Sequence, residues 1–137
     1  MSESHIFPLR VYFEDTDAGG IVYYANYLKY AERARTEMLR AVGVESSRLI
    51  DEDNVALTVK TCVLDYLKPA RLDDALEVHT RVTEVGGASM RGEQQIKCNG
   101  ETLVDIKIKL ACMAMNGKPA RMPKDLRSTL DNLCVTR

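Results

Sequence analysis

Two spacings of apolar residues along the chain predict its secondary structure. Apolar residues at 3.6-residue spacing predict one amphipathic helix from about residue 24 to residue 42, with Gly43 as its C-terminal stop. The apolar stripe of this helix consists of Tyr27, Ala31, Ala34 and Met38, followed by Ala41 or Val42. The next short segment, 45–53, is predicted to be helical or irregular.

Strict alternation of apolar and polar residues predicts five strands. The first carries Phe7, Leu9, Val11 and Phe13 on one face. The second is predicted to have a single apolar face formed by Val55, Leu57, Val59, Thr61 and Val63. Three more strands are predicted over about 76–82, 90–98 and 104–114, and the pairs Gly86-Gly87 and Asn99-Gly100 between them are typical of hairpin turns.

This order of elements predicts the fold class. Consecutive hairpins imply an antiparallel sheet, and the one long amphipathic helix must bury its stripe against that sheet. We therefore expect a single α+β domain over residues 1–137, with a five-stranded sheet wrapped around one central helix. An open sheet of this kind has two edges, which favours pairing with a second copy of the chain.

Composition and charge narrow the classes of function. The 137 residues include 19 basic and 20 acidic side chains, so the net charge is −1 and general nucleic-acid binding is disfavoured. We expect no transmembrane segment and no signal peptide, because the chain has no long apolar run and begins without a basic and apolar leader. The four cysteines form no C-x-x-C pair and, with two histidines, no metal-ligand set, so reduced thiols in a cytoplasmic protein are expected.

The segment between the first strand and the long helix is the best candidate for a site. It carries Asp15 and Asp17, then Gly19 and Gly20, just before the N-terminus of the predicted helix. Free N–H groups at a helix start can polarise a carbonyl, and a carboxylate beside them can act as base or nucleophile, which suits acyl transfer. The alternative is an ordinary turn-rich loop, because aspartate and glycine are common in turns.

The run of residues 11–40, VYFEDTDAGGIVYYANYLKYAERARTEMLR, resembles the signature of the 4-hydroxybenzoyl-CoA thioesterase family of the hotdog fold. It is most similar to the Tol-Pal-associated acyl-CoA thioesterase branch of that family. The resemblance rests on four features: the D-T-D acids, the Gly-Gly pair, the aromatic pair Tyr23-Tyr24 and the E-x-A-R sequence beginning at Glu32. Length and element order agree with this family over nearly the whole chain.

The resemblance implies roles for the loop residues. It implies that Asp17 is the catalytic carboxylate, that the backbone N–H near Tyr24 polarises the thioester carbonyl, and that Gly19 and Gly20 shape the loop around the acyl group. Asp17 either attacks the carbonyl directly or activates water. In many members of the branch a histidine stands where this chain has Tyr24, so no imidazole acts there in this protein.

Other polar residues have weaker claims to a role in catalysis. Glu32 lies within the long helix, where other hotdog thioesterases place a carboxylate, but pairing with an arginine is the favoured role, and Arg35 is interpreted in the same way. Hotdog hydratases use a histidine, yet His79 and His5 are both distant in sequence from the loop. A histidine-dependent hydratase is therefore disfavoured.

The phosphates of CoA require cations and hydrogen-bond donors, and the family places such contacts in the later hairpins. The candidates for the phosphates there are Arg91, Lys118 and Arg121, with Lys124 as a further cation. Ser89 is the candidate for a hydroxyl contact to the pantetheine arm of the substrate.

Taken together, these features predict a cytoplasmic hotdog thioesterase that hydrolyses acyl-CoA or an acyl-carrier substrate. No cofactor is implied, acyl carrier protein is a possible partner, and the chain is expected to form a dimer or a dimer of dimers, a homotetramer, with sites at the subunit interface. The alternative is a non-catalytic hotdog module that binds acyl chains or acyl carrier protein.

Overall fold

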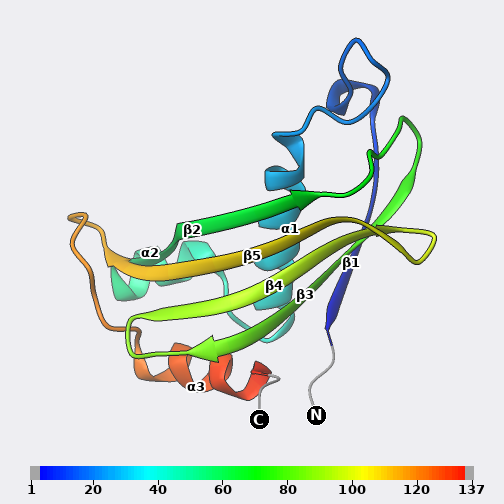
Figure 1. Ribbon diagram of the computed structural model, residues 1–137. Coiled ribbons are helices and arrows are strands. Elements are labelled where there is room, and N and C mark those ends of the chain that lie inside the picture. Colours follow the sequence, from blue (N-terminus) through cyan, green and yellow to red (C-terminus); the bar gives the residue numbers. More distant parts are fainter. Residues whose placement is uncertain (1–3, 135–137) are drawn as a thin grey trace.

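A curved antiparallel sheet of five strands surrounds one long helix in the computed structural model, which describes residues 4–134 (Figure 1). The strands are β1 (His5–Arg10), β2 (Val55–Tyr66), β3 (Ala75–Val85), β4 (Ser89–Cys98) and β5 (Glu101–Ala114). Their order in the sheet is β1-β3-β4-β5-β2, so β1 and β2 are the two edges. The predicted α+β class and the number of strands are confirmed.

The long helix α1 (Asn26–Ala41) runs across the inner face of the sheet. Its buried face is formed by Tyr27, Tyr30, Ala31, Ala34, Met38 and Leu39. The alanines at 31 and 34 are at most 1% exposed, and their small side chains let the helix lie close to the strands. The predicted stop is confirmed, because Gly43 adopts a φ of +86°, which glycine tolerates without strain.

The first strand ends earlier than the alternation predicts. Arg10 is the last residue of β1, where it pairs with Ala75 at the start of β3, so no partner strand remains beyond it. The Asp15 carboxylate then accepts a hydrogen bond from the Tyr12 N–H at 2.9 Å and draws the chain into a 3-10 turn, Phe13–Asp15. Phe13 is consequently 81% exposed instead of lying on the strand face.

The single apolar face predicted for the second strand is wrong, because a β-bulge divides β2. Val59 pairs with Leu110, but Thr61 pairs with Lys109, so Lys60 is an extra residue between them. A bulge shifts the alternation by one, and after it Cys62 and Leu64 pack on the core. Val59 and Val63 are 48% and 54% exposed, respectively.

Two further helices lie on the left side of the molecule in Figure 1, the first beside β2 and the second below the sheet. The segment 45–53 contains the helix α2 (Ser46–Asp53), in agreement with the helical alternative. The C-terminal helix α3 (Lys124–Leu133) was not predicted; it buries Leu126 and Leu130 against β3. These residues extend the core around the C-terminal half of α1, while a second cluster surrounds its N-terminal half.

Among residues 4–134, no helix is both long and apolar enough to cross a membrane. The cysteines at positions 62, 98 and 112 form no disulfide within the described residues.

Candidate active site

The loop that carries the two aspartates, residues 15–22, is a short hairpin held against the start of α1 (Figure 1). We call it the Asp17 loop. Its two sides meet in a bridge between Thr16 and Val22, and the Asp17 N–H donates to the Ile21 carbonyl at 2.9 Å. The Val22 N–H then donates to the buried Ala70 carbonyl at 2.9 Å, which anchors the loop to the β2–β3 connection. The loop is therefore fixed at its base and open at its tip.

The Asp17 side chain has one bound oxygen and one free oxygen. Its Oδ1 accepts a hydrogen bond from the Gly19 N–H at 2.8 Å. No hydrogen bond or ion pair to Oδ2 is formed by any residue within 4–134, and the side chain is exposed. A carboxylate fixed through one oxygen presents the other in a defined direction, as a general base or nucleophile requires.

Asp15 is used differently, although it lies only two residues away. Its Oδ2 accepts from the Tyr12 N–H, and its main-chain carbonyl accepts from the Tyr23 N–H at 2.9 Å and from Asn26 Nδ2 at 2.8 Å. These contacts join the end of the first strand segment, the loop and the first residue of α1. Asp15 therefore holds the loop in place, and Asp17 is the acid left free to react.

The start of α1 offers free backbone N–H groups, which are the donors that polarise a substrate carbonyl in acyl transfer. The N–H groups of Tyr24 and Ala25 have no hydrogen-bond acceptor within the described part of the chain, and the N-cap position carries no side-chain cap. The helix dipole adds positive charge at this end. Free N–H donors at a helix start and a carboxylate with a free oxygen are the two kinds of group that acyl transfer uses.

Three tyrosine rings surround these donors. The rings of Tyr23 and Tyr24 lie 4.9 Å apart, and Tyr66, at the end of β2, meets Tyr24 edge-on at 6.1 Å. The pKa of Tyr23 is raised by the neighbouring Tyr24 and further by the negative charge of Asp17, so its phenol stays protonated at neutral pH. Each of the three rings is about half exposed, and together they make an aromatic surface beside Asp17.

The two glycines of the loop differ in what they tolerate. Gly20 has a φ of +78°, a left-handed conformation that requires glycine, and an added Cβ there meets no atom within 4 Å. Gly19 has no such backbone constraint, but a Cβ there would lie 3.2 Å from Asp17 Oδ1. Gly19 therefore keeps the space next to the bound oxygen of the carboxylate.

We expect Gly19→Ala to lower kcat roughly tenfold, because the methyl group pushes the carboxylate away from its hydrogen bond and small misplacements of reacting groups are costly. The melting temperature should change little. Steady-state thiol release and a thermal melt test this; Gly20→Ala, whose methyl group meets nothing, should mainly lower the melting temperature. Unchanged turnover in Gly19→Ala would show that the orientation of Asp17 does not depend on this space.

The residues predicted to bind the CoA phosphates lie far from Asp17 within one chain. The Arg121 guanidinium lies over the β3–β4 hairpin, where a Cβ on Gly87 would meet it at 3.0 Å, and Ser89 follows in the same hairpin. Lys118 is exposed in the connection from β5 to α3. Their sequence neighbours Met90 and Met122 pack in one cluster with Met38 and Leu39, near the C-terminal end of α1. That end is about 24 Å along the helix from its first residue.

Arg91 faces the outer side of the sheet, where it pairs with Glu84 (Nε to Oε1, 3.4 Å). In register beside it is Lys109, and Lys107 lies two residues along the same strand. With Val63 and Gly92, these side chains line a shallow cavity of about 290 Å³. The two lysines add positive charge beside Arg91. They were not singled out from the sequence, because alternation marks them as surface residues but does not reveal their register with Arg91.

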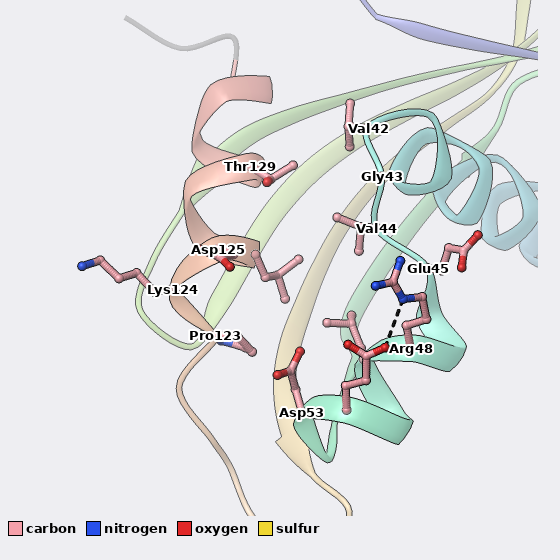
Figure 2. Close-up of a pocket in the computed structure, with 13 residues that line it drawn as sticks. Val42, Gly43, Val44, Glu45, Arg48, Asp53, Pro123, Lys124, Asp125 and Thr129 are labelled. Carbon is pink, nitrogen blue, oxygen red and sulfur yellow. Dashed lines mark hydrogen bonds and ion pairs between the residues drawn. The ribbon is translucent and has the colours of Figure 1, made fainter.

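The pocket shown in Figure 2 lies near the C-terminal end of α1, between α2, α3 and the turn that follows α1. It has a volume of about 340 Å³ and is lined by acidic side chains that include Glu45, Asp53 and Asp125. Lys124 stands at its rim and points away from it. None of the residues that build the Asp17 loop lines this pocket.

The remaining candidates are engaged elsewhere. Glu32 accepts a hydrogen bond from Thr36 at 2.6 Å, and Arg35 donates to Gln94 Oε1 at 3.0 Å. His79 lies 3.0 Å from Glu77 on β3, and His5 belongs to the edge strand β1. None of these side chains contacts the loop-helix junction.

Asn26 and Tyr66 complete the junction and were not identified from the sequence. Asn26 lies where a helix start is expected, and a short amide side chain there is a usable signal for a local hydrogen bond. Tyr66 approaches from a distant strand, and its hydroxyl donates to the Tyr24 carbonyl at 3.5 Å. No local pattern indicates a contact of this kind.

Comparison with known proteins identifies the family. The model of the thioesterase-like superfamily matches residues 11–130. The chain is 44% identical to the acyl-CoA thioesterase YbgC of Haemophilus influenzae over 93% of this chain and 94% of that protein. It is 42% identical to the acyl-CoA thioester hydrolase YbgC of Escherichia coli O157:H7 over 87% and 90%, respectively.

The fold agrees with solved structures. The crystal structure of a probable thioesterase from Bartonella henselae superimposes with a TM-score of 0.85 at 35% identity, over 88% of this chain and 99% of that one. The sheet curled around α1 is the hotdog fold that the motif at 11–40 implies. The chain therefore belongs to the thioesterase-like superfamily and is a thioester hydrolase.

Proposed function

We propose that the protein hydrolyses acyl-CoA thioesters at the junction of the Asp17 loop and α1. One observation carries this proposal: the free Oδ2 of Asp17 lies in the same junction as the uncapped N–H groups of Tyr24 and Ala25. The names of the YbgC relatives, which act on acyl-CoA, support the substrate class.

The chemistry follows from these groups. The thioester carbonyl oxygen accepts hydrogen bonds from the helix start, which stabilises the negative charge that develops as the carbon is attacked. The attacking oxygen belongs either to a water molecule deprotonated by Asp17 or to Asp17 itself. The C–S bond then breaks, CoA leaves as a thiolate that takes up a proton, and in the second route water hydrolyses the mixed anhydride formed on Asp17.

A panel of acyl-CoA substrates tests this function directly. Purified protein should release free thiol from at least one short, long or aromatic acyl-CoA well above the uncatalysed rate. An acyl-loaded carrier protein, offered in parallel, distinguishes the free cofactor ester from a carrier-bound substrate. Absence of release from every substrate, with binding of acyl-CoA retained, would contradict hydrolysis and favour a non-catalytic acyl-binding module.

We also propose that the active form contains at least two copies paired through β2. The outer edge of this 12-residue strand has no partner strand among residues 4–134. The strand carries the exposed apolar side chains of Val59, Val63 and Tyr66, and the exposed Leu67 follows it. Antiparallel pairing of two β2 edges brings the Tyr66 end of one copy beside the Val55 end of the other. The phosphate-binding candidates of one copy thereby approach the Asp17 loop of the other.

We expect light scattering to give the mass of a dimer or a tetramer for the unaltered chain. Val59→Glu combined with Val63→Glu should shift the mass to that of a monomer and lower turnover, because charges on the edge oppose pairing. Ile6→Glu, an exposed site on the opposite edge strand, is the matched control and should leave the mass unchanged. A monomeric unaltered chain would contradict the shared site.

The cellular setting is part of the same proposal. The resemblance of residues 11–40 to the Tol-Pal-associated branch supports a cytoplasmic enzyme that works alongside that system. Cell fractionation tests the compartment, and co-purification of the Tol and Pal proteins tests the association.

A further inference from the structure

The Asp15 carbonyl is the point at which the catalytic loop is joined to α1. It accepts two hydrogen bonds, one from the Tyr23 main chain at 2.9 Å and one from Asn26 Nδ2 at 2.8 Å. The second donor is a half-buried side chain on the first residue of α1. A second α1 side chain, the buried Tyr30, also lies near Asp15: burial and then the Asp15 carboxylate raise the pKa of the Tyr30 phenol. Asn26 differs from Tyr30 in that it donates to the main-chain carbonyl of Asp15.

In the sequence, this contact lies two residues from each of the two groups proposed to act on the thioester, Asp17 and the Tyr24 N–H. Asp17 is two residues after Asp15, and Tyr24 is two residues before Asn26. Any change in the distance between Asp15 and Asn26 therefore moves the free carboxylate oxygen relative to the free N–H groups. Tyr30 faces the Asp15 side chain and donates no hydrogen bond to this carbonyl within residues 4–134, so it does not replace the Asn26 contact.

We propose that Asn26 is a positioning residue for thioester hydrolysis, which acts by holding the Asp17 loop at a fixed distance from the donors of α1. This inference rests on the proposed function. It assigns the two acids of the D-T-D motif separate duties, since Asp15 receives the contact and Asp17 reacts. Asn26 itself touches neither the reacting carbon nor CoA.

The expected effect falls on turnover rather than on binding. A misplacement of about 1 Å between reacting groups costs up to about 100-fold in rate. The CoA portion is expected to contact Ser89, Arg91, Lys118 and Arg121, which lie far from Asn26, so its binding is left intact. Loss of the Asn26 amide should therefore lower kcat tenfold or more and change KM less than twofold.

Two substitutions remove the donor in different ways. Asn26→Leu keeps the approximate size of the side chain and removes its polarity, while Asn26→Asp keeps the shape and replaces the donating nitrogen by an oxygen. Thr36→Val is the matched control, because Thr36 also donates one side-chain hydrogen bond on α1, to Glu32, away from the loop. Thermal melts of all three report the structural cost alone.

A double-mutant cycle with Asp17→Asn separates positioning from general damage. If Asn26 acts by placing Asp17 relative to the donors, Asn26→Leu should lower kcat in the unaltered enzyme and have little further effect once Asp17 is replaced. Unchanged kcat in both Asn26 variants would overturn the proposal. An equal loss with and without Asp17, or a loss no greater than that of Thr36→Val at the same melting temperature, would also overturn it.

The Asp17→Asn single variant of the same cycle tests the proposed function itself. Full activity of the Asp17→Asn single variant would show that Asp17 does not react, whatever the Asn26 variants do. It would also remove the basis for the positioning role.

Discussion

Replacing Asp17 by asparagine should lower kcat for thioester hydrolysis by two or more orders of magnitude. The amide keeps the shape of the side chain, and its oxygen still accepts the Gly19 N–H, so the loop should keep its conformation. What is lost is the negative oxygen that attacks the carbonyl or activates water, and one such group contributes about 10²- to 10⁴-fold. Steady-state thiol release measures the loss.

Asp15→Asn is the matched control for this change. Asp15 acts on its neighbours largely through its main-chain carbonyl, which the substitution leaves in place, and the amide oxygen still accepts from the Tyr12 N–H. We expect a loss of less than tenfold. The reverse result, an inactive Asp15 variant and an active Asp17 variant, would exchange the roles assigned to the two acids.

The largest expected loss of stability comes from Gln94, a fully buried polar side chain between α1 and the sheet. Its Nε2 donates to the Ala31 carbonyl at 2.9 Å and to Thr80 Oγ1 at 3.0 Å, and its Oε1 accepts from Arg35. Gln94→Met fills similar space but leaves Thr80 and the half-buried guanidinium without these partners. Unsatisfied groups of this kind cost about 1–3 kcal/mol each, so we expect a loss of about 2 kcal/mol or more.

Thermal melts of Gln94→Met and Gln95→Met test this expectation side by side. Gln95 is the next residue of β4 and faces the outer side of the sheet, so its replacement should be close to neutral. For a chain of this length, a loss of 2 kcal/mol lowers Tm by roughly 8 °C. Equal melting temperatures would show that the hydrogen bonds of Gln94 do not stabilise the contact between α1 and β4.

Local pattern predicted the parts of the fold that local forces determine. The stripe of α1, the stop at Gly43 and the Asn99-Gly100 hairpin each depend on residues close together in sequence, and each is confirmed. The two residues of that hairpin have φ values of +52° and +80°, as an Asn-Gly turn favours.

The features that were predicted wrongly or missed depend on contacts with residues that are distant in the sequence. The bulge at Lys60 arises from the pairing of β2 with β5, and no residue within β2 marks it. The first strand ends because β3 offers no partner beyond Ala75, and the spacing of Leu126 and Leu130 is too short a stripe to predict α3 by itself.

The candidate site was likewise predictable only where it depends on residues close together in the sequence. The motif predicted which loop and which helix start belong together, and the structure supplies what the motif lacks: the contacts that leave Asp17 free and engage Asp15. The phosphate-binding candidates remain predictions. Their separation from Asp17 within one chain follows from how the strands are arranged around α1, which no spacing in the sequence reveals.

The structure of the Asp17→Asn protein with an unhydrolysed acyl-CoA bound is the measurement that tests the central claim most directly. The claim predicts the thioester carbonyl oxygen at about 3 Å from the N–H of Tyr24 or Ala25, with its carbon facing the side chain at position 17. It also predicts the CoA phosphates against Arg121, Lys118 or Arg91 of a second copy. A thioester bound elsewhere, such as in the pocket between α2 and α3, would contradict the claim.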